Sequence, residues 1–208
     1  SKGFKNMSKR IFIEGSINSE LCIISADGQE INYFDYSDDL ATSKKNNIYL
    51  GTVSRVEPSL QAAFIEFGSE KKAFLPFDEI HPSYFKLPHN EKILFKNNDK
   101  NSYEDDEKES KRHFLFFYRK YKIQDVIKKD QVLLIQIVKE ERGTKGAAIT
   151  TFISLPGRYS VLLPNNSSSG GVSKKISNPL DRKRLKKLHD NFNLPDGMSL
   201  IIRTNAIS

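Results

Sequence analysis

Short runs of alternating apolar and polar residues fill most of the chain, and a period of two is typical of β-strands. Three such runs, IFIEG, ELCIIS and INYFDY, follow one another between residues 10 and 36. The last two runs are separated by a turn that contains Asp27-Gly28, and Asp-Gly between apolar runs favours a hairpin. The pattern predicts a small strand unit over residues 9–43, and the polar stretch SDDLATSKK leads from it into the next part of the chain.

Residues 44–156 carry five further strand-like runs. They are IYLGTVSRVEP, LQAAFIEFG, KKAFLPFDEI, QVLLIQIVKEE and AAITTFIS. Gly68-Ser69 marks the turn between the second and third runs. Five short strands with glycine-containing turns fit a small Greek-key barrel of the OB type. We therefore predict an α+β chain that is mostly β and is organised around a five-stranded OB-type barrel.

A charged insertion interrupts the predicted barrel between its third and fourth strands, over about residues 82–121. Its acidic part holds Glu104, Asp105, Asp106, Glu107 and Glu109, and its basic, aromatic part holds Lys111, Arg112, Phe114, Phe116, Phe117, Tyr118, Arg119 and Lys120. A connection this long inside a small barrel is usually an insertion, and the acidic part is typical of a solvated excursion. Two interpretations stay open for the insertion, which are a charged flexible loop without function and a loop that docks a protein.

Residues 157–208 predict a small α+β unit. RYSVLLPNN predicts a strand, and a loop of small residues follows it. Asn178 is placed to cap a helix whose first residue is Pro179. Leu185, Leu188 and Phe192 recur at helical spacing among many basic residues, which predicts an amphipathic, basic helix. MSLIIRT then predicts a final strand.

Phe64 lies at an unexpected position in the run LQAAFIEFG. The period of two separates Ala63, Ile65 and Phe67, a buried set, from Phe64 and its polar neighbour Glu66. Phe74 has the corresponding parity in the next run, so Phe64 and Phe74 can share one outward face if the two strands pair after Gly68. OB folds bind single-stranded nucleic acid on the outer face of these two strands, with exposed aromatic rings as stacking platforms. The alternative is that a neighbouring unit or the insertion covers the two rings.

Three further places could bind phosphate. Lys145 lies in a tight turn between Gly143 and Gly146, which suits a phosphate contact at the barrel mouth, although a lone turn lysine is usually just solvated. A glycine-rich loop with cations offers the backbone amides and charges of an anion pocket. Its residues are Gly170, Gly171, Ser173, Lys174 and Lys175. Arg203-Thr204 follows an apolar strand, where the guanidinium can bind a phosphate bidentately or simply point into solvent.

Composition favours a polyanionic partner and excludes several classes of protein. The net charge is +7, which favours nucleic acid. Cys22 is the only cysteine, so the chain predicts neither an internal disulfide nor a cysteine-rich zinc site, and a cytoplasmic location is expected. No apolar run approaches the length of a membrane span. The four histidines are scattered, and no Walker loop, GxSxG or HExxH motif occurs, so we predict no catalytic constellation in these residues.

The order of the motifs carries a resemblance to a known family. EPSLQAAF (57–64) and KEERGTKGAA (139–148), followed by GGVSKKI (170–176) and LIIRT (200–204), strongly resemble the N-terminal half of the bacterial ribonuclease E/G family. The resemblance runs from about Lys9 to Thr204. It implies that residues 9–43 form part of an RNase H-like subdomain. It also implies that residues 44–156 form an S1-type OB domain and that residues 157–208 belong to the subdomain that senses the RNA 5′ end.

The resemblance also implies roles for single residues. Phe64, Phe74 and Lys145 match RNA-contacting positions of the family's OB domain. Arg203 and Thr204 match the pair that holds the 5′-monophosphate. Val161 matches the residue that packs under the terminal base, and Gly170, Gly171, Lys174 and Lys175 fall in the loop near that pocket. The family's Arg-Thr pair is normally followed by Ala-Gly, whereas this chain continues with Asn205-Ala206. The insertion resembles the version in alphaproteobacterial members.

At the level of function, the resemblance implies the RNA-binding and 5′-monophosphate-sensing portion of an endoribonuclease that cleaves single-stranded RNA in rRNA processing and mRNA decay. The family's catalytic Mg²⁺ and its inter-protomer Zn²⁺ are held by sequence placed further on, so we expect neither metal site, and no activity, in these residues alone. Expected partners are single-stranded RNA with a 5′-monophosphate, a second copy of the protein and an RNA-degradation complex. The alternative is a stand-alone RNA-binding adaptor without nuclease activity, and the coding sequence beyond Ser208 would distinguish the two.

Overall fold

The structure is a computed structural model, and it describes the ranges 9–15, 21–27, 30–37, 43–88, 107–166 and 170–207. The chain divides into two compact units, residues 1–43 and residues 44–208. Each unit is described below by itself. The division falls after the predicted strand unit and before the first strand of the predicted barrel.

The first unit is an antiparallel sheet of three strands in the order β1-β2-β3. The strands are β1 (Lys9–Gly15), β2 (Leu21–Asp27) and β3 (Glu30–Ser37). The register aligns Phe12 with Ile24 and Ile24 with Phe34. The three predicted strands are therefore present. Apolar side chains of both parities are exposed within this unit. Phe12 alternates with Ile11 and Ile13 in β1, Phe34 alternates with Tyr33 in β3, and all five are more than half exposed.

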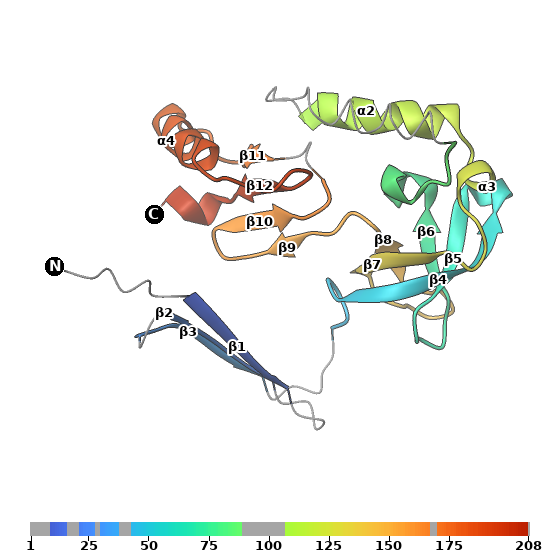
Figure 1. The fold of residues 1–208 in the computed structure, drawn as a ribbon, viewed down its shortest axis with the longest axis horizontal. Coiled ribbons are helices and arrows are strands. Elements are labelled where there is room, and N and C mark those ends of the chain that lie inside the picture. Colours follow the sequence, from blue (N-terminus) through green and yellow to red (C-terminus); the bar gives the residue numbers. More distant parts are fainter. Residues whose placement is uncertain are drawn as a thin grey trace. The chain divides into compact units, whose positions relative to one another are not determined.

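The second unit contains a closed barrel of five strands in the order β4-β5-β6-β8-β7 (Figure 1). The strands are β4 (Ile48–Glu57), β5 (Ala62–Glu66), β6 (Ala73–Pro76), β7 (Val132–Lys139) and β8 (Ala148–Thr150). All neighbours are antiparallel except β6 and β8, which pair in parallel. A five-stranded Greek-key barrel is the OB-type architecture, and this prediction is confirmed.

The alternation of the strands explains the barrel core. Ala63 and Ile65 of β5, Ala73 and Leu75 of β6, and the odd-numbered residues of β7 from Leu133 to Ile137 all have at most 1 % exposure. These positions share one parity in each strand and therefore point into the barrel. Phe67, which the pattern places in the same set, is half-buried and contacts the ring of Tyr49. Burial of these apolar side chains supplies the main stabilisation of the barrel.

The C-terminal part of the insertion folds as a helix on the barrel, which the charge pattern did not predict. Helix α2 (Glu107–Lys120) is followed by the short helix α3 (Ile123–Val126). Phe114 and Phe117 of α2 are buried, and Phe117 belongs to the barrel core cluster. The acidic residues 104–106 lie outside the described residues, whereas Glu107 and Glu109 lie within the first turn of α2. The insertion therefore contributes packed aromatic residues to the barrel.

Tyr118 fixes helix α2 to the connection that follows β6. Its hydroxyl donates a hydrogen bond of 2.7 Å to the Ile80 carbonyl oxygen, and its ring contacts Phe77 and Phe85. Burial, with a smaller contribution from the negative charges of Asp78 and Glu79, raises the pKa of the Tyr118 phenol far above its usual value. The phenol therefore stays protonated and keeps its role as a hydrogen-bond donor.

After the barrel the chain forms a second sheet with the order β11-β12-β10-β9. The strands are β9 (Leu155–Pro156), β10 (Ser160–Leu163), β11 (Gly171–Val172) and β12 (Ser199–Ile202). Two partly buried amide networks join the barrel to this part. Gln136 of β7 bonds both the carbonyl oxygen and the amide of Ser154, each at 2.8 Å, and Asn165 bonds the Thr151 carbonyl oxygen and the Ile153 amide.

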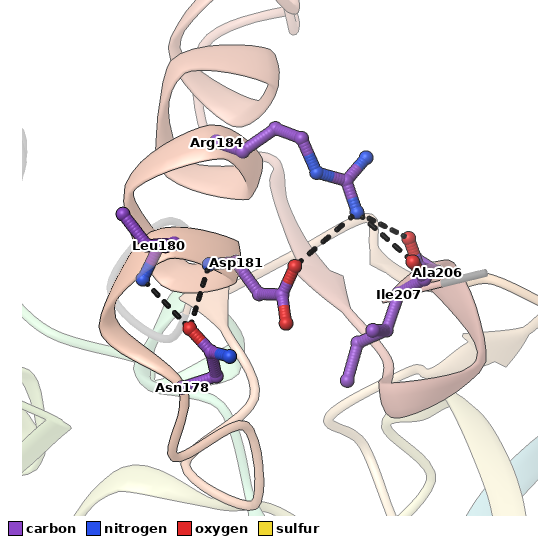
Figure 2. Close-up of polar contacts among 6 residues, drawn as sticks. All are labelled: Asn178, Leu180, Asp181, Arg184, Ala206 and Ile207. Carbon is purple, nitrogen blue, oxygen red and sulfur yellow. Dashed lines mark hydrogen bonds and ion pairs between the residues drawn. The ribbon is translucent and has the colours of Figure 1, made fainter.

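Helix α4 (Pro179–Asp190) begins where the sequence predicts. The side-chain oxygen of Asn178 accepts hydrogen bonds from the amides of Leu180 (2.9 Å) and Asp181 (3.4 Å), as Figure 2 shows. This cap satisfies two of the amides that the first turn leaves without helical partners. Only part of the predicted apolar stripe is buried, since Leu185 is 1 % exposed but Leu188 and Phe192 are about half exposed.

Candidate nucleic-acid interface

Phe64 and Phe74 form an aromatic pair on the outer face of the barrel. They are register partners across β5 and β6, and their ring centroids lie 5.9 Å apart with an interplanar angle of 65°. Both side chains are half-buried, whereas Ala63, Ile65 and Leu75 beside them are fully buried. The predicted shared outward face is therefore present. An edge-to-face pair of this kind leaves ring surface accessible for a further planar group.

Cationic side chains extend this pair into a row across the barrel. Arg55 of β4 is the register partner of Phe64, and its guanidinium carbon lies 4.7 Å from the centre of the Phe64 ring. On the other side, Phe74 aligns with Ala148 of β8, and Ala148 aligns with Lys139 of β7. We call these five residues the aromatic row. A β-bulge between Val53 and Arg55 turns Arg55 toward Phe64.

Lys145 lies in the β7–β8 connection, beside the start of β6. Its turn is closed by two backbone hydrogen bonds between Arg142 and Lys145, of 3.1 and 3.0 Å. A Cβ added at Gly146 would lie 1.9 Å from the Lys72 carbonyl oxygen, so only glycine allows this approach. The Phe74 amide also donates to the Ala147 carbonyl oxygen at 2.7 Å. Lys145 is exposed, and the close approach at Gly146 holds its turn near the Phe74 end of the row.

Arg203 follows β12 and lies against the β9–β10 connection. Its guanidinium donates a 2.6 Å hydrogen bond to the Gly157 carbonyl oxygen, and its amide donates to the Tyr159 carbonyl oxygen at 2.8 Å. Val161 of β10 is the register partner of Ile201, two residues before Arg203. The structure thus brings Arg203 and Val161 to one region of the sheet. Gly157 and Tyr159 also belong to this region. The sequence did not identify them, because only the register of the sheet places their turn beside Arg203.

Thr204 begins a 3-10 turn, Thr204–Ile207, which helix α4 holds in place. The guanidinium of Arg184 bonds the carbonyl oxygens of Ile207 (3.1 Å) and Ala206 (3.5 Å) and lies 3.8 Å from the Asp181 carboxylate (Figure 2). These carbonyl oxygens are at the C-terminal end of the turn, where a cation is favourable. Asn205 and Ala206 lie within this turn, and Thr204 is exposed at its start.

The glycine-rich loop adds the strand β11 to the other side of β12. Gly171 aligns in parallel with Ile201, so Gly171, Ile201 and Val161 form one row across three strands. Gly171 has a φ of +127°, a conformation that side-chain-bearing residues rarely adopt. Gly170, Lys174 and Lys175 are exposed. The predicted loop residues therefore lie on the far side of β12 from Val161, and the Ser173 amide donates to the Ile202 carbonyl oxygen at 2.8 Å.

Neither a metal site nor a membrane span is found in the described part of the chain. No group of three or more histidine, cysteine, aspartate or glutamate side chains lies close enough to hold a metal ion among the described residues. No described helix combines the length and apolar character that crossing a membrane requires.

Fold and surface together define an OB-type barrel with an aromatic and cationic outer face. Comparisons with known proteins point to one family. A model of the ribonuclease E/G family matches residues 154–208. Ribonuclease E of Buchnera aphidicola subsp. Acyrthosiphon pisum is 42% identical over 196 residues, which are 94% of this chain and 19% of the relative.

Two relatives from Escherichia coli strain K12 give the same result. Its ribonuclease E is 40% identical over 96% of this chain and 16% of the relative, and its ribonuclease G is 37% identical over 77% of this chain and 28% of the relative. The chain belongs to the ribonuclease E/G family. It spans about a fifth or less of the length of these two ribonuclease E relatives.

Proposed function

We propose that residues 44–208 bind single-stranded RNA on the aromatic row and recognise its 5′-monophosphate beside Arg203. In this proposal they form the substrate-binding part of an endoribonuclease. The observation that carries the proposal is the row itself, in which two aromatic rings lie between Arg55 on one side and Lys139 on the other, with Lys145 in the turn beside the Phe74 end. Relatives named ribonuclease E and ribonuclease G supply RNA as the class of ligand.

The row suits single strands because of how stacking and charge act together. Unpaired bases expose their planar faces, and an aromatic ring stacks on any of them without reading its edge. The backbone phosphates are then within reach of the flanking cations, whose attraction weakens with salt. In a duplex the bases already stack on one another, so the Phe64 and Phe74 rings would have no free base face to cover.

The 5′-phosphate would be recognised by hydrogen bonds and charge instead of by stacking. A guanidinium can donate two parallel hydrogen bonds to a phosphate, and the exposed Thr204 hydroxyl can add a third. Arg203 already donates to the Gly157 carbonyl oxygen, so its position is fixed before any ligand arrives. Val161 offers an apolar surface for the terminal base, and the loop cations Lys174 and Lys175 add positive charge, although they lie across β12.

Phosphodiester cleavage would belong to another part of the relatives' longer chains. The role proposed for these residues is to orient the RNA and to verify its 5′ end. The same proposal includes four further points. Residues 9–43 form part of an RNase H-like subdomain, the protein is cytoplasmic, it self-associates, and it belongs to an RNA-degradation complex.

Replacing Arg203 by alanine is expected to abolish a preference for 5′-monophosphate RNA over 5′-hydroxyl RNA. A charge-assisted bidentate contact contributes roughly 1.5–3 kcal/mol, so the affinity ratio of the two oligonucleotides should fall about 10-fold or more toward unity. The measurement is fluorescence anisotropy with a matched pair of single-stranded oligonucleotides that differ only at the 5′ end.

The control for this experiment is Lys183→Ala, which removes one exposed cation from α4 and should leave the preference intact. The measured quantity is the ratio of the two affinities. A general loss of RNA binding lowers both affinities together and leaves this ratio unchanged. An Arg203→Ala protein that keeps the full preference would contradict the assignment of the 5′ site.

A further inference from the structure

An open groove adjoins the aromatic row at its β4 end. It has a volume of about 810 Å³ and is lined by β4, by the end of β5 and the β5–β6 connection, by α3 and by the segment between α3 and β7. Its charged side chains are four cations and two carboxylates, namely Arg55, Lys72, Lys128, Lys129, Glu66 and Asp130. We call it the basic groove. Since Arg55 belongs to both the row and the groove, the two are continuous on the surface.

The basic groove keeps an excess of positive charge after its ion pair is taken into account. The Lys72 ammonium is engaged by the Glu66 carboxylate at 2.9 Å and by the Ser54 hydroxyl at 2.5 Å. The hydrogen bond from Lys72, with smaller contributions from Ser54 and the charge of Lys129, lowers the pKa of Glu66. Glu66 is therefore ionised and largely neutralised by Lys72. Arg55, Lys128 and Lys129 remain against the single carboxylate of Asp130, so the groove keeps an excess of positive charge.

Lys128 and Lys129 form a ridge that the backbone fixes to β4. The Asp130 amide donates to the Val53 carbonyl oxygen at 2.8 Å, and the Val53 amide donates to the Gln131 carbonyl oxygen at 2.9 Å. Asp130 adopts a left-handed conformation (φ 65°), which closes the turn. Both lysine side chains are exposed, and a second hollow of about 440 Å³, which includes Lys86, lies on the other flank of the ridge. The backbone that carries the two lysines is thus held in a fixed place beside β4.

We propose that the basic groove binds the phosphates of the RNA segment that continues past Phe64, so that the interface holds a longer strand than the two rings alone. This inference rests on the proposed function, because the groove would extend the same bound strand. Single-stranded nucleic-acid sites combine stacking rings with a positively charged groove that follows the backbone. Arg55 connects the two parts, since its guanidinium covers the Phe64 ring and also lines the groove.

Replacing Lys128 and Lys129 together by alanine should weaken binding in a length-dependent way. Affinity for a 5′-hydroxyl dodecauridylate should fall roughly 10-fold, while affinity for the tetrauridylate should change less than about 2-fold, because only the longer strand reaches the groove. For two lost phosphate contacts, the slope of log affinity against log salt should become shallower by about 1.4 for the dodecamer. Fluorescence anisotropy at several salt concentrations measures both quantities.

Two further variants make the result decisive. Lys183→Ala with Lys187→Ala removes the same charge from α4 and should leave the affinity for both oligonucleotides unchanged within about 2-fold. Phe64→Ala with Phe74→Ala should weaken both lengths, so if that variant changes neither, the proposed function itself fails. If it weakens both while the Lys128/Lys129 variant loses no more affinity for the dodecamer than for the tetramer, only the basic groove is refuted. That second result would leave the groove to a different ligand, such as an acidic protein segment.

Discussion

Replacing Phe64 and Phe74 together by alanine is expected to lower the affinity for single-stranded RNA by about 30-fold or more, because each stacked base contributes ~1–3 kcal/mol. Both rings are half-buried and face outward, so the loss falls on ligand contacts more than on the barrel core. Removing the Phe64 ring also takes away the surface that orders Arg55, whose guanidinium lies 4.7 Å from it. Anisotropy with a 5′-hydroxyl oligonucleotide measures this effect apart from the 5′ site.

A conservative variant separates stacking from folding. Phe64→Tyr with Phe74→Tyr keeps two aromatic faces and should bind within a few-fold of the unchanged chain. The thermal midpoint of each variant shows whether the barrel is intact. If the double alanine variant is folded and binds RNA as tightly as the unchanged chain does, the two rings are not the stacking platform.

Replacing Phe117 by alanine is expected to destabilise the second unit by ~3–5 kcal/mol, the usual cost of truncating a buried phenylalanine. Phe117 is 5 % exposed and belongs to the barrel core cluster although it comes from the insertion. The cavity would lie beneath α2, next to the ring of Tyr118 that packs on Phe77. This cost is a large part of the ~5–15 kcal/mol that stabilises a typical domain. Denaturant unfolding followed by circular dichroism measures it.

The neighbouring residue provides the matched control. Phe116 is on the same helix and is 60% exposed, so Phe116→Ala makes the same chemical change without opening a core cavity. Its effect should stay at or below ~1 kcal/mol, because the exposed ring loses only its edge-to-face contact with Phe117. Equal effects of the two substitutions would contradict the packing of α2 on the barrel and would favour the charged flexible loop.

The sequence predicted the barrel and its aromatic face because both follow from local rules. Alternation assigns Ile65 and Phe64 to opposite faces, and the Gly68 turn, with a φ of +89°, lets β5 and β6 pair directly. The sequence left only the register of β5 and β6 undetermined, and the structure shows that it aligns Phe64 with Phe74. The Asn178 cap was predicted for the same reason, since an N-cap and Pro at the first helical position are a local signal.

What the sequence did not predict depends on contacts between distant segments. From its charge, the insertion is interpreted as a charged flexible loop or a loop that docks a protein. Phe114 and Phe117 of its basic part are nevertheless buried on the barrel, and only tertiary packing determines that. The hydrogen bond from Arg203 to the Gly157 carbonyl oxygen joins residues 46 positions apart. In the sequence, Lys128 and Lys129 look like part of an ordinary polar turn. The backbone hydrogen bonds of Asp130 and Gln131 to Val53 place this turn beside Arg55. Such long-range placements have no signature in a local pattern.

The most direct test of RNA binding on this face is to map where the RNA contacts the chain. Isotope-labelled protein titrated with a 5′-hydroxyl tetrauridylate should show its largest amide shifts in β5, β6 and the β7–β8 turn, at Phe64, Phe74 and Lys145. A competing surface exists on β4 and β7, where Leu50, Val132 and Leu134 are exposed by 71%, 55% and 39%. Shifts concentrated at Leu50, Val132 and Leu134, with Phe64 and Phe74 unaffected, would contradict RNA binding on the aromatic row.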